Sequence, residues 1–547
     1  MENKNERNKE TTNKVLRLAK PVKKGLLHLI FSRTIIIVLL LLAQIMLMVS
    51  FYSWLNEYLP HFSACMTVFN IVMVIVLFNM EMDAEAKLTW MLIIAVLPIF
   101  GAALLLFTRV NAGHRQVKKS VEDEIDRTRK MIPQPAGTAD ALREGGSGLD
   151  DLSRYLNRSG CFPVFENEES RYFPSGEAYF EGVLEELSKA EEYIYLEFFI
   201  IEEGEMWGRI LEILKEKADA GLDVRVMYDG MCELNSLPKN YLKLLRRAGI
   251  TAKAFSPIMP VISSHYNYRD HRKILVIDGK TAFTGGVNLA DEYINVKERF
   301  GHWKDAGLMV RGAAARSFTL MFLQMWNITE READYSRVTE NMPQPVPENT
   351  VVRAKWSPER KMASEGGYVM PYADCPLDND KVGETVYMDI LYRANDYVHI
   401  MTPYLILDGE LKAALKYAAE RGVDVKLILP GIPDKKAAYA LAKSHYKELV
   451  ASGIEIYEYT PGFVHSKIFV SDDKKAVVGT INLDYRSLYH HFECAAYLYK
   501  TPCVAEVEAD FCETLTKCRR VTPETIRKEK LSYKITGWIL KFTAPLM

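Results

Sequence analysis

The sequence lacks several features that would assign its class at once. None of its eight cysteines forms a Cys-x-x-Cys pair or stands at zinc-ligand spacing from a histidine, a pattern typical of scattered reduced thiols. Neither sign of charge dominates, because the formal net charge is −2, and this balance gives no support for a nucleic-acid-binding protein. Long apolar runs are nearly confined to the first 110 of the 547 residues, so the remainder reads as a mixed globular chain.

The apolar runs near the N-terminus predict a transmembrane region over residues 34–108. Three stretches are candidate spans, at 34–55, 62–79 and 88–107, because each is uncharged and about 20 apolar residues cross a bilayer. Tyr52 and Trp54 end the first span, where aromatic side chains suit an interface. A cleaved signal peptide is not expected, since the first run is too long and follows a polar lead.

The charged flanks of these spans leave the topology open. Residues 1–33 form a basic N-terminal segment, which is either a membrane-surface segment or the charged flank of the first span. Basic residues also follow the last span, and the positive-inside rule would place both flanks in the cytoplasm. With three candidates, one is interfacial or re-entrant, or the N-terminus lies outside. We favour a cytoplasmic catalytic region.

Beyond the apolar region the chain repeats itself. Residues 109–160 are polar, with Gly and Pro clusters, and we expect them to be a linker. Residues 161–345 and 346–547 then carry matching successions of strand-like and helix-like segments. Such alternation predicts an α/β fold of layered units, and two units in one chain suggest a pseudo-twofold pair.

Each half contains one copy of the pattern H-x-K-x4-D. The two copies are His271, Lys273, Asp278 and His465, Lys467, Asp472. On a strand, a His and a Lys two apart point to the same face, and a turn signal at each Asp predicts a hairpin. An asparagine follows each copy, Asn288 in the first half and Asn482 in the second.

Two such sets facing each other suit phosphoryl transfer without a metal. One imidazole would attack phosphorus while the other gives and takes protons, and lysines and asparagines would hold the nonbridging oxygens. As partners that fix the histidine tautomers, alignment of the halves nominates Asp305 in the first half and Glu493 in the second. We expect Asp278 and Asp472 to brace the turn or bind lysine. Glu197 is either a partnered core carboxylate or a support for the site.

The doubled motif resembles the signature of the phospholipase D superfamily, over about residues 160–520. Two kinds of feature resemble bacterial cardiolipin synthases in particular. One is the candidate membrane spans ahead of the repeat. The other is a set of short motifs, Gly286-Val-Asn288, Thr402-Pro-Tyr404 and Asn482-Leu-Asp-Tyr-Arg-Ser487. The resemblance implies two phospholipase D-like α/β/α layered domains, preceded by transmembrane helices. It also implies a membrane phosphatidyltransferase that converts two phosphatidylglycerol molecules to cardiolipin and glycerol, with no cofactor or metal. His271 would be the nucleophile and His465 the acid/base, although the symmetry permits the reverse.

Other functions stay open at this point. A phospholipase D that hydrolyses phospholipids to phosphatidic acid would use the same phosphohistidine. A nuclease is disfavoured by the apolar region and the balanced charge. An inactive scaffold is disfavoured by the intact motifs. We expect the bilayer of the bacterial cell membrane as a partner and no nucleic acid, and the oligomeric state is unknown. The apolar C-terminal tail, residues 535–547, either docks on the membrane or packs on the core, and we favour docking.

Overall fold

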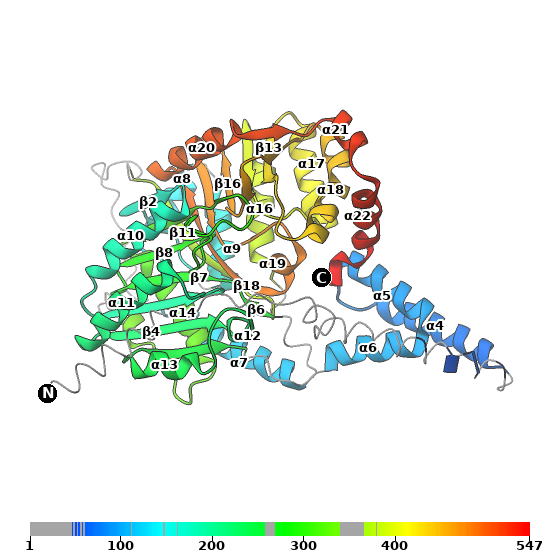
Figure 1. Ribbon diagram of the computed structural model, residues 1–547, viewed down its shortest axis with the longest axis horizontal. Helices are drawn as coiled ribbons and strands as arrows, with labels where there is room; N and C mark the ends of the chain where they lie inside the picture. The colour runs from blue at the N-terminus through cyan, green and yellow to red at the C-terminus, as the bar shows by residue number, and fades with distance from the viewer. Residues whose placement is uncertain are drawn as a thin grey trace. The chain divides into compact units, whose positions relative to one another are not determined.

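Two mixed β-sheets with the same strand order organise the chain after Val110 in the computed structural model (Figure 1). The structure describes residues 61–110, 112–145, 148–160, 162–256, 268–339, 366–378 and 380–546, with isolated positions between 46 and 57. The first sheet follows the order β2 (Glu169–Phe173), β10 (Gly307–Arg311), β8 (Thr281–Gly285), β7 (Lys273–Ile277), β3 (Tyr193–Phe198), β4 (Asp223–Asp229), β5 (Thr251–Phe255). The second follows β1 (Phe165–Glu166), β11 (Tyr368–Asp374), β18 (His491–Tyr499), β17 (Lys475–Gly479), β16 (Ile468–Ser471), β12 (Tyr397–Met401), β13 (Asp424–Pro430), β14 (Glu455–Tyr459), β19 (Cys518–Arg520).

The strand directions match as well as the order. In each sheet three strands are parallel (β3, β4 and β5; β12, β13 and β14), and the strands on the other side of β3 and β12 join antiparallel. The motif strands β7 and β16 therefore occupy equivalent central positions. The predicted repeat of α/β units is confirmed at the level of the fold.

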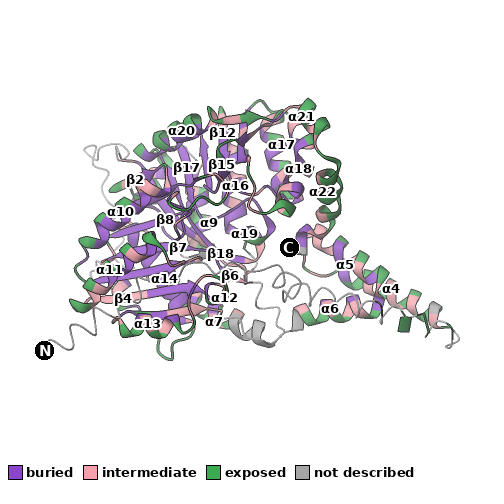
Figure 2. Ribbon diagram, viewed as in Figure 1, coloured by how far each residue is buried: buried purple, intermediate pink, exposed green. Residues whose placement is uncertain are grey.

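Helices connect the strands and cover the sheets. In the first half they are α10 (Gly176–Ser188), α11 (Glu205–Asp219), α12 (Cys232–Asn235), α13 (Tyr241–Arg247), α14 (Ala315–Asn327) and α15 (Ser336–Thr339). In the second they are α16 (Val382–Arg393), α17 (Gly409–Glu420), α18 (Lys436–Ala451), α19 (Tyr485–Tyr489), α20 (Pro502–Leu515), α21 (Pro523–Lys528) and α22 (Leu531–Thr543). The central strands are buried, whereas the edge strands β2, β5 and β19 and the outer helices have exposed residues (Figure 2).

Two helices tie the sheets together in an equivalent way. The buried helix α14 packs on β3, β7 and β8 of its own sheet and on β11 of the other. Its counterpart α20 packs on β12, β16 and β17 and on β2 of the first sheet. Apolar side chains of both halves accordingly share one core cluster.

Each half also lends a short strand to the other. The strand β6 (Arg269–Asp270), just before the first motif, pairs in parallel with β18 of the second half. Reciprocally, β15 (Gly462–Val464), just before the second motif, pairs in parallel with β9 (His302–Lys304) of the first. These exchanges place the first motif beside β18, which carries Glu493, and the second motif beside β9, which Asp305 directly follows.

Residues 112–160, most of the expected linker, contain three helices: α7 (Ala112–Thr128), α8 (Thr138–Glu144) and α9 (Leu149–Gly160). Apolar residues spaced along them, including Val121, Leu142, Leu152 and Leu156, are buried in the shared core. The segment therefore belongs to the packed structure. The domain boundaries given above stay a prediction.

The N-terminal unit consists of α4 (Phe62–Phe78), α5 (Ala84–Val96) and α6 (Pro98–Val110). Among the residues that the structure describes, no helix combines the length and the apolar composition needed to cross a bilayer. The prediction of transmembrane helices at 62–79 and 88–107 is thus not supported. Leu97 separates α5 from α6, because Pro98 lacks a backbone N–H and starts a new helix. The candidate span 34–55 and residues 1–33 lie outside the continuously described part.

Candidate active site

The two motifs lie on equivalent β-hairpins. The strands β7 and β8 are joined through Asp278 and Gly279, with φ values of 52° and 63°, and β16 and β17 through Asp472 and Asp473, with φ values of 55° and 54°. Two successive positive φ angles are typical of the tight turn that matches strand twist. The hairpins predicted from the turn signals are confirmed.

The motif aspartates brace these hairpins and stay away from the histidines. The Asp278 carboxylate accepts backbone N–H bonds from Glu191, Glu192 and Tyr193 at 2.8–2.9 Å. The Asp472 carboxylate accepts the equivalent bonds from residues 395, 396 and 397 at 2.9–3.1 Å. Each carboxylate ties the end of a motif strand to the start of the neighbouring strand, which agrees with the bracing role that we expected.

The motif histidines contact carboxylates of the opposite half. Nδ1 of His271 lies 2.9 Å from Oε1 of Glu493, and Nδ1 of His465 lies 2.7 Å from Oδ2 of Asp305. The backbone does the same: N–H of His271 donates to the Phe492 carbonyl, and N–H of His465 donates to the Lys304 carbonyl. Each carboxylate thus serves the histidine of the opposite half, an exchange that alignment of the repeats did not reveal. Because Nδ1 is engaged, Nε2 is the nitrogen left for chemistry.

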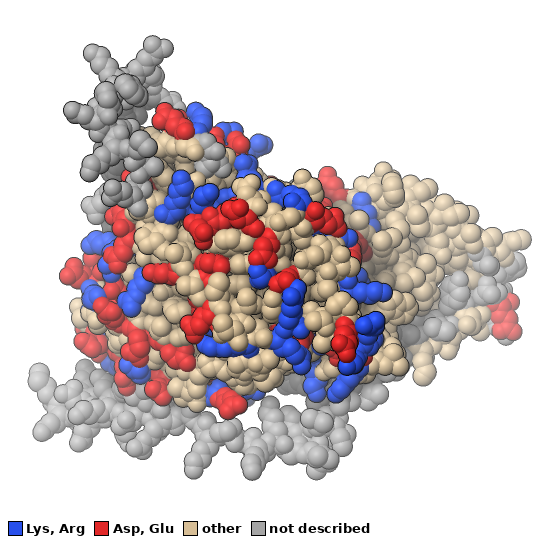
Figure 3. All heavy atoms as spheres, turned by 90° about the horizontal axis from the view of Figure 1, so that it is seen from above, with Lys and Arg blue, Asp and Glu red and all other residues tan. Residues whose placement is uncertain are grey.

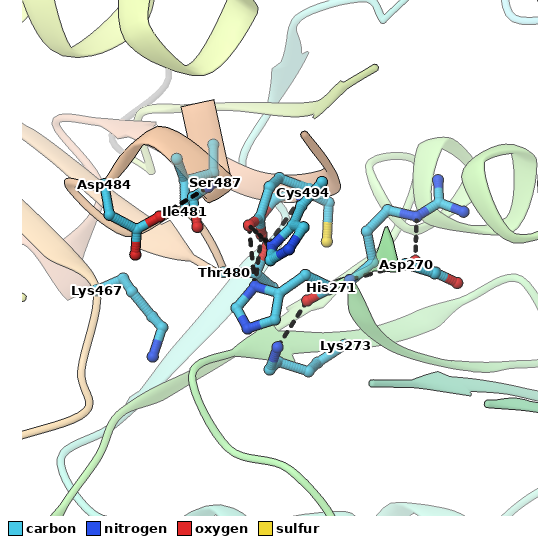
Figure 4. Close-up of polar contacts among 12 residues, drawn as sticks. Asp270, His271, Lys273, Lys467, Thr480, Ile481, Asp484, Ser487 and Cys494 are labelled. Atoms are coloured by element: carbon cyan, nitrogen blue, oxygen red, sulfur yellow. Dashed lines mark hydrogen bonds and ion pairs between the residues drawn. The ribbon is translucent and has the colours of Figure 1, made fainter. Parts of the chain in front are cut away.

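Both motif lysines are buried beside the histidines. Lys273 is fully buried and donates to the backbone oxygen of His271 at 2.6 Å. Nζ of Lys467 lies 2.9 Å from Nδ1 of His465. Figure 4 shows Lys467 of the second motif next to His271 and Lys273 of the first, so the two motifs share one site. Glu493 and Asp305 are the nearby carboxylates that act on both lysines through their charge.

Burial shapes the protonation of this group. It lowers the pKa of Lys467 to about 7 and that of Lys273 to about 8, because a buried ammonium loses hydration. It also lowers the pKa of His465 to about 4, with Lys467 as the second cause, and that of His271 well below its ordinary value. A bound phosphate would favour the charged form of all four groups.

The pKa values of the two carboxylates are shifted in opposite directions. Burial acts to raise the pKa of both, and it prevails at Glu493, whose pKa lies well above its ordinary value. At Asp305, His465 and Lys467 outweigh burial and hold the pKa below its usual range. The lowered pKa of Asp305 favours its ionised form beside His465, whereas the raised pKa of Glu493 disfavours the ionised form beside His271.

Of three other predicted site residues, Asn288 and Glu197 have protein partners, and Asn482 has a buried oxygen without one. The amide of Asn288 accepts from the Ile200 N–H at 3.1 Å and donates to the Tyr293 hydroxyl at 2.8 Å. Asn482 is buried with an unpaired Oδ1. Glu197 forms a buried ion pair of 2.5 Å with Arg272, the residue between His271 and Lys273, and so fits the partnered core carboxylate.

Side chains around each histidine break the symmetry. The His271 ring lies beside Phe199 and His491, at centroid distances of 4.9 and 5.3 Å. The His465 ring is instead surrounded by the aromatic rings of Tyr293, Trp303 and Phe463 at 5.3–5.9 Å. Sequence reasoning did not assign these neighbours to the site. Two of them could have been found from their positions in the sequence. His491 stands two residues before Glu493, and Trp303 stands two residues before Asp305.

A metal ion has one candidate location among the described residues. Ligand atoms of His271, His491 and Glu493 lie within 4.8 Å of one another. The surrounding charge does not favour a cation, since Lys273 and Lys467 both lower the pKa of His271. The arrangement fits an anion between the two motifs better than a divalent ion.

Two imidazoles whose Nδ1 atoms contact carboxylates, beside two buried lysines, form an arrangement that suits transfer of a phosphodiester group. Two family models match the chain, one described as cardiolipin synthase, PLD-like domain, over residues 183–326 and 387–515, and one as phospholipase D-nuclease N-terminal over 68–109. The chain belongs to the cardiolipin synthase family of the phospholipase D superfamily.

Individual relatives agree with this assignment. A cardiolipin synthase of Alkalihalophilus pseudofirmus is 32% identical over 477 residues, covering 86% of this chain and 91% of the relative. An uncharacterised protein of Streptococcus mutans is 52% identical over 475 residues, covering 87% and 99%. Among solved structures, the phosphatidylserine synthase of Haemophilus influenzae superimposes with a TM-score of 0.52 at 16% identity, covering 70% of this chain and 95% of that one, which supports the fold.

Proposed function

We propose that this cardiolipin synthase joins two phosphatidylglycerol molecules into cardiolipin and glycerol through a phosphohistidine. The observation that carries the reaction type is the shared site in which both H-x-K motifs meet and both Nδ1 atoms are held by carboxylates. Nε2 of one histidine attacks phosphorus as the bond to glycerol breaks. The terminal hydroxyl of the second phosphatidylglycerol then displaces the histidine.

We favour His271 as the nucleophile and His465 as the acid/base, because the pKa of Asp305 is lowered whereas that of Glu493 is raised. His465 must carry a proton when the glycerol leaves, and a bound phosphate together with the neighbouring Asp305 would favour that charged form. A nucleophile must be neutral when it attacks, and burial next to Lys273 keeps His271 neutral. His465 would protonate the leaving glycerol oxygen and later take the proton of the incoming hydroxyl.

The lysines would bind the charge that moves during transfer. Lys273 and Lys467 approach the site from opposite halves, so each can face a nonbridging phosphate oxygen. A phosphate anion would restore their protonation, and the buried setting strengthens the attraction relative to water.

Product analysis with purified full-length protein and phosphatidylglycerol vesicles tests this function. We expect cardiolipin and glycerol in equal amounts. Phosphatidic acid in place of cardiolipin would overturn the synthase function in favour of hydrolysis.

Single replacements test the two-histidine mechanism. His271→Ala and His465→Ala should each abolish transfer, while the buried, non-motif His399→Gln variant serves as a control because His399 pairs with Glu508 away from the site. Full activity in either motif variant would refute the mechanism.

The setting that we propose is the cytoplasmic face of the bacterial cell membrane, with phosphatidylglycerol drawn from the bilayer. The basis is the family and the apolar N-terminal composition. The multi-pass topology predicted from the sequence stays unconfirmed, since among the described residues no helix can cross a bilayer. Protease protection of sealed membrane vesicles would test the side, since cytoplasmic catalytic halves are cleaved only in inverted vesicles.

A further inference from the structure

The last helix of the catalytic unit carries an exposed apolar stripe. On α22, Leu531, Ile535, Trp538, Ile539 and Phe542 are 38–77% exposed, with Trp538 the most exposed. Their spacing of i, i+4, i+7, i+8 and i+11 places them along one face of a helix. Among described residues after Val110, ten large hydrophobic side chains are exposed, and five of them lie here. Concentration on one face indicates a contact surface.

The opposite face of α22 already has its partner. Gly537 packs against α18 so closely that a Cβ atom would come within 2.3 Å of the Ala440 carbonyl oxygen. The Tyr533 ring meets the Tyr439 ring edge-on at 5.9 Å, and Leu540 packs on a buried cluster with Leu441. Positions 533, 537 and 540 thus fix the helix to the protein, and the exposed stripe necessarily points outward.

Positive charge lies beside the stripe. Helices α18, α21 and α22 line a cavity of about 610 Å³ with seven basic and two acidic side chains. The acidic ones, Glu458 and Glu529, are both engaged by Lys443, and Glu458 also pairs with Arg519. Lys534 and Lys541 of α22 are exposed at this surface. Lys and Arg side chains gather on the side of the molecule that carries α21 and α22 (Figure 3).

The stripe is structurally connected to the second motif. The cluster that receives Leu540 includes Tyr485 and Ile406. Tyr485 follows Asp484, whose buried carboxylate lies near Lys467, and Ile406 lies on the loop after β12. The helix therefore sits on the loops that frame the active site.

We infer that α22 is a docking helix that inserts its apolar stripe into the interface of an anionic bilayer, with its lysines on lipid phosphates. A helix with Trp on the apolar face and lysines at the side is suited to lie in that interface. Binding of this helix does not depend on the proposed reaction. It would hold the catalytic loops at the level of the lipid headgroups.

Tryptophan quenching by brominated lipids tests the docking in the full-length protein. The contribution of Trp538 is the difference between the wild type and Trp538→Phe, reconstituted in vesicles with bromine on the acyl chains. We expect quenching of Trp538 in vesicles of phosphatidylglycerol and phosphatidylcholine, and much less in phosphatidylcholine alone. Lys534→Glu with Lys541→Glu should weaken docking to the anionic vesicles by at least about 30-fold, because the loss of each lysine costs about one kcal/mol and the new glutamates add repulsion.

A matched control carries the same charge change elsewhere. Lys239→Glu with Lys243→Glu alters two exposed lysines by α13 and should leave the quenching of Trp538 unchanged. Equal quenching with and without anionic lipid would overturn the inference, as would absence of quenching, which would mean that another segment or a second copy covers the stripe. Because the readout needs no turnover, a failure of docking and a failure to make cardiolipin remain distinguishable.

Discussion

Replacing Asp305 by asparagine removes the negative charge that lies 2.7 Å from Nδ1 of His465 and preserves the shape of the side chain. If His465 is the acid/base, the variant no longer stabilises the protonated form of His465, in either the formation or the breakdown of the phosphohistidine. General acid–base catalysis contributes about 10²–10⁴-fold, so we expect kcat to fall by that factor, or about 3–5 kcal/mol of barrier. Glu493→Gln makes the matched change at His271.

The leaving group distinguishes the two histidines. A phosphatidyl donor with a p-nitrophenyl group leaves without protonation, so it bypasses the acid in the first step. We expect Asp305→Asn to release p-nitrophenol in a burst at nearly the wild-type rate, and then to stall because activation of the incoming alcohol is slow. Glu493→Gln should slow the burst itself, since it perturbs the nucleophile. Stopped-flow absorbance at the nitrophenolate band gives both phases.

The reasoning is refuted if the two variants exchange these behaviours. A slow burst in Asp305→Asn with a normal burst in Glu493→Gln would make His465 the nucleophile. An equal loss of rate with phosphatidylglycerol and with the p-nitrophenyl donor, in both variants, would mean that the carboxylates act only by holding the fold. Thermal unfolding of each variant would show whether its stability had fallen.

Three further predictions concern charge, stability and metal. Lysines are charged below their pKa, so kcat/KM should fall as pH rises through about 7–8. The Lys467→Arg variant keeps its charge and should move this fall to higher pH. A pH profile that does not move would contradict the role of Lys467. Asp472→Ala orphans three backbone N–H groups and should lower the free energy of unfolding by about 3 kcal/mol at pH 7. Since backbone bonds outweigh burial and hold the pKa of Asp472 below its usual range, its contribution is present above about pH 4 and lost as pH falls through the folded-state pKa, so urea unfolding should differ less at pH 3. Chelators should leave the rate of transfer unchanged, whereas a loss restored by one divalent metal would require a metal in the mechanism.

The doubled motif made much of the fold predictable. A strand ending in Asp278-Gly279 followed by a short strand indicates a hairpin from local chemistry alone, and the second copy at Asp472 indicates a repeat. The exchange of carboxylates was not accessible in that way. It depends on β6 and β15 crossing between halves, and strands of two and three residues leave no hydrophobic periodicity to detect. The composition of residues 88–107 suggested one membrane span, but the segment is divided between two shorter helices at Pro98.

The crossing strands also explain why neither half can form a site alone. His271 takes its carboxylate and its backbone acceptor from β18, and His465 takes both from the region of β9, so each imidazole is oriented only after the halves have joined. Exact symmetry would then give two equivalent histidines and no preferred direction of transfer. The asymmetry arises from the neighbours: burial prevails at Glu493 but not at Asp305, and His491 stands where Trp303 stands in the other half. A duplicated chain can change these positions separately, which a dimer of identical halves cannot, and the proposed division of the histidines into nucleophile and acid/base would make use of that freedom.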